Sequence, residues 1–479
     1  MSADTESIPR ILFLTGRLAE PALRDLLPRL AKQHQFEYDI EVLGISVAAL
    51  MHTDWVTRKL NQSKRRPGIS PDQFHKVVVP GWCQGSLDQL SAEFSIPFER
   101  GPKDMYDLPL YFGASEREPP DLSEYTTEII AEINHGPRMT DAAIMEMASR
   151  FRASGADLID LGCIPGEQWS RVGDVTRLLV KEGFRISVDS FDEREVSESV
   201  AAGAELVLSC NQSNIAWAKK LGVELVAIPD RPDDHASLER TVAELTEQKV
   251  PFRIDPILEP IGFGFAASLA RYYDARQRWP ELPMMMGIGN LTELSEVDSV
   301  GINFLLAGIC QELRIRSVLT TEVINWCRTA VQEFDHARRL MHFSFGLGTL
   351  PKHIDSSLVM LRDPRLHERG EEALEQMQSQ IRDRNFRIFA ERGELHLLNR
   401  DGYWHGTDPY ELFDRIVAES GDLDASHAFY LGYELCKATT ALNLGKQYQQ
   451  DQALSWGFLT VPEVSAHERR RQEKQNTSG

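Results

Sequence analysis

Residues Gly155–Gly162 read GADLIDLG and residues Ile186–Phe191 read ISVDSF, so each stretch joins an apolar, strand-like run to an aspartate. Eight short apolar runs of this kind recur between Ser123 and Pro364, and a helical pattern follows each one. They are Glu128–Ile133, Leu158–Leu161, Arg185–Val188, Leu206–Ser209, Glu224–Ala227, Phe252–Asp255, Met284–Gly287 and Arg314–Val318. Eight parallel strand-helix units with right-handed connections close a barrel, so the sequence predicts an α/β fold, a (β/α)8 TIM barrel. A doubly wound open sheet is the competing architecture.

The residues before the barrel have the pattern of a small α/β domain. Strand-like and helical runs alternate there, at Arg10–Gly16, Glu20–Lys32, Glu41–Ile45, Val47–Leu60 and Val77–Pro80. The next segment, Ala114–Leu122 (ASEREPPDL), disfavours both helix and interior strand because it combines charges with a Pro-Pro pair. We therefore predict an N-terminal domain over residues 1–118 and the barrel over residues 119–365.

Residues 366–479 predict a C-terminal α+β domain. Two strand-like runs, Phe386–Ala390 and Glu394–Leu398, flank Glu391-Arg392-Gly393, which is typical of a hairpin. Helical patterns cover residues 366–384, 409–420 and 427–448. The tail after Pro462 is polar, so we predict that it is disordered.

Composition excludes some classes of partner. A formal charge of −20 and a pI near 5.2 argue against nucleic acid, because phosphate backbones are held by clustered Lys and Arg. The six cysteines are scattered, which favours a reducing, cytoplasmic location over a disulfide framework. No run of 18 apolar residues occurs, so no membrane span is predicted.

Polar residues recur where the predicted strands end, which is where barrel proteins place their functional groups. They are Asn134, Asp160, Asp189, Ser209 and Asn211, Asp255, Asn290, and Arg314 and Arg316. A lone aspartate after a strand is more often the N-cap of the next helix than a ligand group. Seven polar strand ends in one barrel instead favour a shared cavity, and its carboxylates and carboxamides suit the N–H donors of a pterin's amino-pyrimidinone edge.

Three of these stretches resemble known motifs. GADLIDLG, ISVDSF and DPILEPIGFGF (Asp255–Phe265) are similar to successive motifs of dihydropteroate synthases, and also to those of the related pterin-binding methyltransferases of corrinoid pathways. MGIGNLTE (Met286–Glu293) is nearer the methyltransferases. The resemblance covers about half of the chain, and it implies a barrel of the dihydropteroate synthase type.

The resemblance also implies roles for residues. Asp255 would bind the pterin ring from a loop containing Gly262 and Gly264, Asp189 would contact the ring, and Asn290 matches a methyltransferase pterin contact. Asn134 would lie near a diphosphate and its Mg²⁺, and Arg316 resembles an anion-binding arginine; with Asp189 these two form the expected catalytic set. Asp160 matches a further pterin-side aspartate, and the strand-four contact is either Ser209 or Asn211.

The flanking regions look like a three-domain, dihydropteroate synthase-related family of organisms that make tetrahydromethanopterin. The resemblance therefore implies a cytoplasmic, Mg²⁺-dependent transferase that joins 6-hydroxymethyl-dihydropterin diphosphate to an arylamine, 4-(β-D-ribofuranosyl)aminobenzene 5′-phosphate. Two departures bear on the amine: Cys163–Glu167 replaces a Glu-Ser-Thr-Arg-Pro loop, and Gly289-Asn290-Leu291 replaces Ser-Arg-Lys.

The anionic groups of such substrates need cations, for which Arg138, Arg171, Lys103 and Lys352 are the candidates. Two other functions stay open: a pterin-binding scaffold without transferase activity, and a methyl-pterin:corrinoid protein methyltransferase. Because related barrels pair through their outer helices, we also expect a homodimer.

Overall fold

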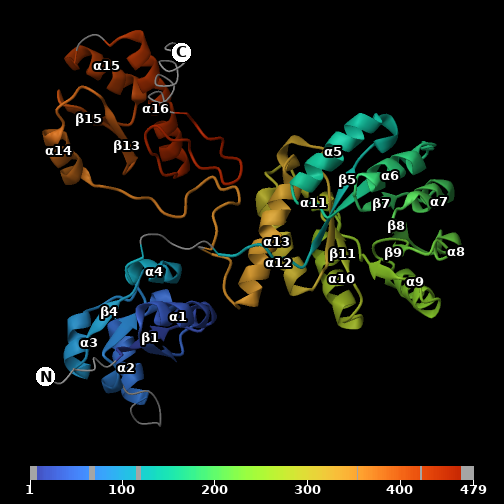
Figure 1. Ribbon diagram of the computed structural model, residues 1–479, viewed down its shortest axis with the longest axis horizontal. Helices are drawn as coiled ribbons and strands as arrows, with labels where there is room; N and C mark the ends of the chain where they lie inside the picture. The colour runs from blue at the N-terminus through green and yellow to red at the C-terminus, as the bar shows by residue number, and fades with distance from the viewer. Residues whose placement is uncertain (1–7, 64–70, 115–119, 353, 421–422, 465–479) are drawn as a thin grey trace, which may run out of the picture. The chain divides into compact units, whose positions relative to one another are not determined.

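The computed structural model describes residues 8–63, 71–114, 120–352, 354–420 and 423–464 (Figure 1). The chain forms two compact units, residues 1–355 and 356–479, and the first contains both a small sheet and the barrel. The predicted three-domain division stays a prediction. Part of the proposed boundary, residues 115–119, and the tail from residue 465 lie outside the described residues.

The N-terminal sheet has four parallel strands in the order β2-β1-β3-β4. The strands are β1 (Arg10–Thr15), β2 (Glu37–Val42), β3 (Lys76–Val79) and β4 (Phe98–Arg100). Its helices are α1 (Glu20–His34), α2 (Thr53–Ser63), α3 (Leu87–Phe94) and α4 (Leu108–Tyr111), with 3-10 turns η1 (Ala48–Leu50), η2 (Pro71–Gln73) and η3 (Met105–Asp107). β1 and β3 are apolar apart from Arg10, Thr15 and Lys76 at their ends, because both of their faces are covered: Leu12 packs in one core and Phe13 in the other.

The barrel strands are β5 (Glu128–Ile133), β6 (Leu158–Gly162), β7 (Ile186–Asp189), β8 (Leu206–Cys210), β9 (Glu224–Ala227), β10 (Phe252–Ile254), β11 (Met285–Gly287) and β12 (Ser317–Thr320). All pair in parallel in the order β10-β9-β8-β7-β6-β5-β12-β11, and a parallel bridge between Ile254 and Met284 joins the two end strands. The predicted barrel is confirmed, and the open sheet is excluded.

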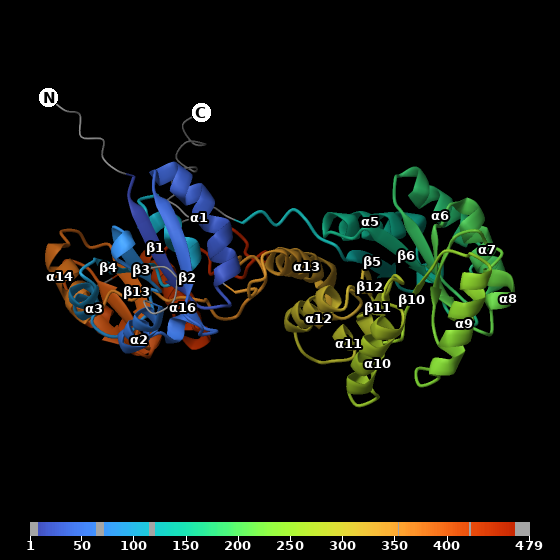
Figure 2. The same cartoon turned by 90° about the horizontal axis from the view of Figure 1, so that it is seen from below.

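The barrel helices follow the strands in sequence order (Figure 2). They are α5 (Asp141–Ala153), α6 (Val172–Lys181), α7 (Glu193–Ala202), α8 (Ile215–Ala218), α9 (His235–Glu247), α10 (Phe265–Arg278), α11 (Gly289–Thr292), α12 (Val300–Glu312) and α13 (Ala330–Gly346), with η4 (Gly136–Arg138) and η5 (Asn325–Cys327). Alternate strand residues face inward and outward, so Ile130, Leu158 and Val226 fill the barrel interior while Ile129, Ile159 and Leu225 pack under the helices.

Ion pairs close the amino end of the barrel. Arg253 pairs with Glu224 at 2.7 Å and with Glu128 at 3.0 Å, and Arg185 pairs with Glu128 and Glu205, both at 2.6 Å. The pair between Arg253 of β10 and Glu128 of β5 joins strands that are not neighbours in the sheet. Arg253 and Arg185 are therefore already neutralised by the protein.

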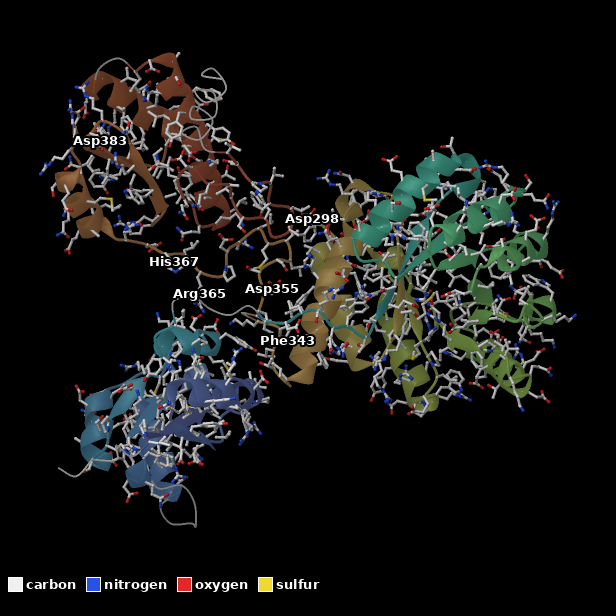
Figure 3. The ribbon with its side chains drawn as sticks, viewed as in Figure 1. Asp298, Phe343, Asp355, Arg365, His367 and Asp383 are labelled. Carbon is white, nitrogen blue, oxygen red and sulfur yellow. The ribbon has the colours of Figure 1, made fainter. Side chains whose placement is uncertain are left out.

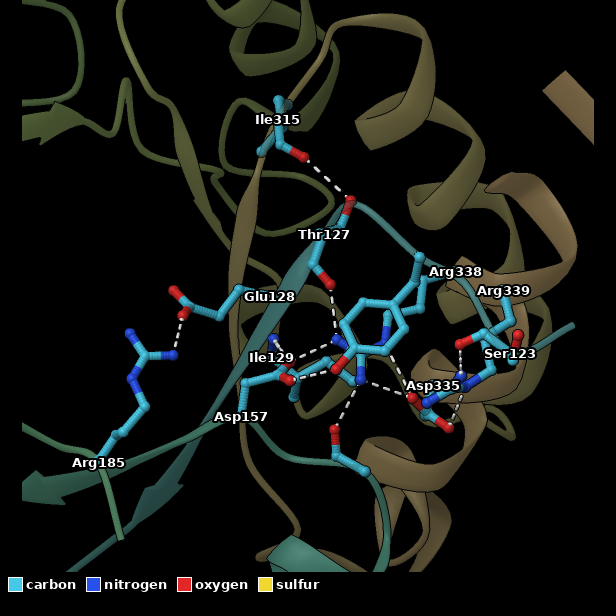
Figure 4. Close-up of polar contacts among 12 residues, drawn as sticks. Ser123, Thr127, Glu128, Ile129, Asp157, Arg185, Ile315, Asp335, Arg338 and Arg339 are labelled. Carbon is cyan, nitrogen blue, oxygen red and sulfur yellow. Dashed lines mark hydrogen bonds and ion pairs between the residues drawn. The ribbon is translucent and has the colours of Figure 1, made fainter. Parts of the chain in front are cut away.

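A buried arginine of α13 holds the start of the barrel in place (Figure 4). Arg338 is 2% exposed, and it donates to the carbonyls of Thr127 and Gly155 and to the carboxylates of Asp157 and Asp335. These groups belong to the entry into β5, the turn before β6 and α13 itself. One side chain thus links the first strand unit of the barrel to its last helix.

The C-terminal unit contains a three-stranded antiparallel sheet and three helices. They are α14 (Glu371–Gln380), β13 (Arg387–Glu391), β14 (Glu394–Leu398), β15 (Tyr403–Gly406), α15 (Pro409–Ser420) and α16 (Ala425–Leu444). Arg392 and Gly393 both have positive φ, which a two-residue hairpin turn requires, so the predicted hairpin is confirmed.

Figure 3 labels Asp383, whose pKa is lowered to about 2 by hydrogen bonds from Arg387 and the Asn385 backbone.

Removing the Arg338 guanidinium should strongly destabilise the barrel. Arg338→Met keeps much of the apolar stem but leaves the Asp157 and Asp335 carboxylates without their buried cation, so we expect a loss of about 3–5 kcal/mol of unfolding free energy. Calorimetry of the full chain should show a lower melting temperature. Arg339→Met is the control, because Arg339 also pairs with Asp335 but is partly exposed; an equal loss in both variants would contradict the proposed linking role.

Candidate functional site

A pocket of about 360 Å³ lies at the carboxyl end of the barrel strands. Its walls come from the ends of β5, β7 and β8 and from the residues that follow β10, β11 and β12. Polar residues dominate among the lining side chains: Glu132, Asn134, Asp189, Ser209, Asp255, Asn290, Glu293 and Thr321. No lysine or arginine of the described chain lines the pocket.

Three carboxyl groups lie on adjoining strands at this end of the barrel: Glu132 and Asp189 line the pocket, whereas Asp160 is fully buried and is not a lining residue. Glu132 pairs in register with Asp160, which pairs with Ser187, and Asp189 lies one inward position above Ser187. Strand alternation puts Glu132 on the same inward side as Ile130, and Asp160 on the same side as Leu158. The closed barrel therefore holds these acids together, away from bulk water.

Burial changes the protonation of this cluster. It raises the pKa of Glu132 to about 8, with further contributions from Asp189 and Glu293, and raises that of Asp189 to about 6. Burial, and then Asp189 and Glu132, raise the pKa of Asp160. The Ser187 hydroxyl donates to Asp160 Oδ1 at 2.6 Å, and Asp160 Oδ2 has no partner among the described residues. At neutral pH Glu132 is protonated and can donate a hydrogen bond.

Asp255, directly after β10, is held from two sides. Its Oδ1 accepts from the Tyr272 hydroxyl of α10 at 2.5 Å and from the Ile257 backbone at 2.7 Å. Burial raises the pKa of Asp255 to about 6, although these hydrogen bonds lower it. Arg271 donates to the Ile257 carbonyl and pairs with Glu259, which holds the DPILEP loop. The carboxylate is therefore fixed in orientation and ionised at neutral pH.

Two carboxamides complete the polar wall. Asn134 donates to Glu132 Oε1 at 3.1 Å, and its own buried Oδ1 has no partner among the described residues. Asn290 of α11 donates to the Leu258 carbonyl at 2.8 Å, which ties α11 to the DPILEP loop. Ser209 lines the pocket, whereas Asn211 accepts from the backbone and hydroxyl of Ser213 and holds a turn. Of the two strand-four candidates, only Ser209 lines the pocket.

The predicted cations do not gather at this pocket. Arg316 precedes β12, so it lies at the amino end of the barrel. Burial, and then Arg314 and Arg316, lower the pKa of the buried Arg276. The expected place of Arg316 in the site is wrong, because the strand begins at Ser317 and its carboxyl end is Thr320. Arg314 has a φ of 53° and belongs to the turn before the strand.

The other expected residues lie elsewhere. Arg138 pairs with Glu167 and Arg171 with Asp141, all on exposed side chains of the barrel loops, and Lys103 and Lys352 line a different cavity. Gly262 and Gly264 belong to the loop before α10, with φ of 86° and 129°, and are not lining residues of the pocket. None of these four cations lines the barrel pocket, and their expected phosphate-binding role stays a prediction.

Two acids that line the barrel pocket, Glu132 and Glu293, were not predicted from the sequence. Glu132 lies within the buried strand EIIAEI, where a charged residue two positions after an inward isoleucine is the signal that was available. Glu293 follows the short helix after β11, and burial raises its pKa. Neither acid ends an apolar run, so neither is found by looking for polar residues at the ends of predicted strands.

Fold and site together define a (β/α)8-barrel protein with an acidic, carboxamide-bearing pocket at the carboxyl ends of its strands. Residues 373–451 match the family PterinBD-DUF4346, and residues 9–103 match DUF6513, a family of unknown function. The first of these matches agrees with the predicted pterin-binding kind of protein. No helix among the described residues is both long and apolar enough to cross a membrane.

Individual proteins are also similar to this chain. The uncharacterized protein MJ0107 of Methanocaldococcus jannaschii is 26% identical over 93% of this chain and 98% of its own length. Among solved structures, Yersinia pestis dihydropteroate synthase with a pterine-sulfa conjugate is 20% identical, with a TM-score of 0.38 over 47% of this chain and 95% of that one. The Thermus thermophilus enzyme in complex with 4-aminobenzoate is 20% identical, with a TM-score of 0.36 over 47% and 96%.

Neutralising Glu132 should stabilise the protein in alkaline buffer. Its folded-state pKa of about 8 lies above the value of 4.5 of an ordinary Glu, so folding holds a proton that the unfolded chain releases. The stability cost of this acid therefore grows as pH rises from 4.5 to 8. Glu132→Gln should raise the unfolding free energy at pH 8 by at least about 1.4 kcal/mol, the equivalent of one pKa unit, and by much less at pH 5.

Thermal unfolding with a metal chelator present, at pH 5 and pH 8, measures this effect. Glu167→Gln is the matched control, because Glu167 is exposed and its pKa is lowered by Arg138; its removal should not stabilise the protein at pH 8. A Glu132→Gln gain that is the same at both pH values would show that the carboxyl is not titrating as described.

Proposed function

We propose that the barrel binds a reduced pterin and uses it in a dihydropteroate synthase-like transfer reaction. The observation that carries this proposal is the pair of acids, Asp189 and the hydrogen-bonded Asp255, that line one pocket with the carboxamide of Asn290. The amino-pyrimidinone edge of a pterin presents adjacent N–H donors, and an ionised, oriented carboxylate accepts two of them side by side. The family match of residues 373–451 supports a pterin as the ligand.

The reaction that the motifs support is condensation with an arylamine. The amine nitrogen forms a bond to the exocyclic methylene of 6-hydroxymethyl-dihydropterin diphosphate, the bond from that carbon to the diphosphate oxygen breaks, and the amine proton passes to solvent. An aromatic amine is neutral at pH 7, so no strong general base is needed. Orientation of the two substrates and stabilisation of the departing diphosphate supply the catalysis.

The donor set fits a Mg²⁺ ion. Asn134 Oδ1 is buried without a partner among the described residues, and the Glu132 and Asp189 carboxyl groups line the same pocket. Oxygen ligands of this kind suit Mg²⁺, which typically binds through one or two carboxylates and the substrate's own phosphates. When bound, the ion would supply charge stabilisation for the diphosphate, a role that no lining lysine or arginine of the described residues fills.

For the amine we propose 4-(β-D-ribofuranosyl)aminobenzene 5′-phosphate in tetrahydromethanopterin synthesis. The support is the loop after β6, where Cys163–Glu167 replaces the motif that serves 4-aminobenzoate in the resembling synthases. Arg138 and Arg171 lie on the loops after β5 and β6. They would reach a phosphate only by leaving Glu167 and Asp141.

A second candidate reaction is methyl transfer from a methylated pterin to a corrinoid protein. The acidic pocket favours it, because Glu132 is protonated at neutral pH and can donate to a pterin nitrogen as its methyl group leaves. The carbon–nitrogen bond then breaks, the methyl passes to the acceptor, and the nitrogen gains the proton. A pterin-binding scaffold would use the same contacts without turnover.

Pterin binding should depend on the charge of Asp255. Asp255→Asn removes the anionic acceptor, and we expect affinity for 6-hydroxymethyl-7,8-dihydropterin to fall by roughly 10- to 100-fold, the effect of a lost charge-assisted contact. Wild-type affinity should fall as pH drops below about 6, where Asp255 and Asp189 take up protons, and the variant should lose only the part of this dependence that Asp255 contributes. Calorimetric titration from pH 5 to 8 measures both, with exposed Asp274→Asn as the control.

The reaction itself is tested by diphosphate release. Purified protein with Mg²⁺ and the pterin diphosphate should release diphosphate with the ribosyl amine and not with 4-aminobenzoate, and chelation of Mg²⁺ or Asp255→Asn should abolish release. Pterin binding without release with either amine would exclude the transferase. Methyl loss from the methylated pterin in the presence of a corrinoid acceptor would then identify the second candidate, and its absence would leave the scaffold.

A further inference from the structure

A second cavity, of about 240 Å³, lies at the carboxyl ends of β1, β3 and β4 of the N-terminal sheet, and Thr349, Leu350 and Lys352, which follow α13, also line it. The strand order β2-β1-β3-β4 means that the chain leaves β1 toward one edge of the sheet and leaves β3 toward the other. Right-handed connections then place the two following helices on opposite faces, which opens a crevice between the ends of β1 and β3. Open α/β sheets bind their ligands at such a point.

The loops around this crevice are packed closely. A Cβ on Gly81 would lie 2.5 Å from the Lys103 backbone nitrogen, and one on Gly16 would lie 2.8 Å from that of Ala48. Only glycine allows these backbones to approach so closely. The crevice is therefore built by tight contact between loops from different strands, which favours a preformed site.

Apolar side chains are unusually exposed around it. Leu18 and Val47 are each 42% exposed, and Trp82 and Leu350 are each 53% exposed, yet all four line the same cavity. Leaving large apolar side chains in water at a concave surface is unfavourable unless a ligand covers them. The body of that ligand should therefore be apolar.

Two lysines supply charge to the same cavity. Lys103 Nζ lies 4.5 Å from the centre of the Trp82 ring, and Lys352 is also a lining residue. Neither forms an ion pair within the described residues. The acid Asp104 also lines the cavity, but its side chain accepts from the Tyr106 backbone at 3.1 Å. An anionic group of a ligand can therefore form ion pairs with both lysines.

The start of α1 does not provide an alternative anion site. The backbone N–H groups of Ala19 and Glu20 both donate to the Gly16 carbonyl, while those of Arg17 and Leu18 donate to the carbonyls of Ile45 and Ser46. A phosphate cannot use these amides as it does in a nucleotide-binding loop. The lysine side chains are left to hold the anionic group.

We propose that this crevice binds a small amphipathic anion, with a flat apolar body against Trp82 and Val47 and one phosphate or carboxylate group at Lys103 and Lys352. The proposal shares no residue with the barrel pocket and does not depend on the proposed transferase. It assigns a ligand-binding role to the N-terminal sheet.

Fluorescence titration of the full chain with 4-methylumbelliferyl phosphate tests the proposal. Comparison with 4-methylumbelliferone, which lacks the phosphate, measures how much the anionic group contributes to affinity. Comparison with inorganic phosphate measures how much the apolar body contributes. Benzoate and phenyl phosphate show whether the site prefers a carboxylate or a phosphate. We expect saturable binding of the phosphate ester, with a dissociation constant that rises on the order of tenfold in Lys103→Met and in Lys352→Met.

The matched control is Lys59→Met, because Lys59 also lies over a tryptophan of this domain, Trp55 at 4.8 Å, but outside the crevice. The affinity of Lys59→Met for 4-methylumbelliferyl phosphate should equal that of the wild type, and so should the affinity of the barrel variant Asp255→Asn. Thermal melting confirms that each variant folds. Equal binding by all four variants, or binding of the ester no tighter than of 4-methylumbelliferone, would overturn the proposal. Absence of saturable binding would do the same.

Discussion

Burial of acids without cations is the constraint on which the barrel site depends. Glu132, Asp160 and Asp189 are held by strand register inside a closed sheet, so they cannot move apart to reduce their repulsion. Such a cluster keeps protons that free carboxyls release, which explains the raised pKa values at this end of the barrel. The buried acids lower the unfolding free energy, and such destabilising clusters of titratable groups are typical of ligand sites.

The two ends of the barrel differ in how charge is used. At the amino end, Arg253 and Arg185 are each shared between two glutamates, so acids and bases neutralise one another. At the carboxyl end, the acids face a pocket that no described lysine or arginine lines. In barrel proteins the amino end serves stability and the carboxyl end serves function, and the charge distribution here follows that division.

Most strands of the barrel were predictable, because buried parallel strands are continuous apolar runs whose limits are visible in the sequence. The start of the last strand was not: Arg314-Ile315-Arg316 alternates as a strand does, but Arg314 has positive φ and belongs to a turn, and β12 begins only at Ser317. That shift put Arg316 at the wrong end of the barrel. Asp189 and Asp255 reach the pocket as the motifs predict, whereas the partners of Arg138 and Arg171 depend on loop geometry that sequence patterns do not encode.

The two halves of a pterin diphosphate would interact differently with the acidic pocket. The ring edge carries N–H donors, so in the proposed complex the ionised Asp189 and Asp255 would bind it directly, and the protonated Glu132 would serve a ring nitrogen or oxygen. A diphosphate brings further negative charge toward the same acids, and the Coulomb repulsion is large in a buried site. Binding the diphosphate therefore requires a cation that accompanies it, whereas binding a methylated pterin does not. In the proposed transferase, a dependence of turnover on Mg²⁺ would follow from this charge balance, and it would be the physical difference between the two candidate reactions.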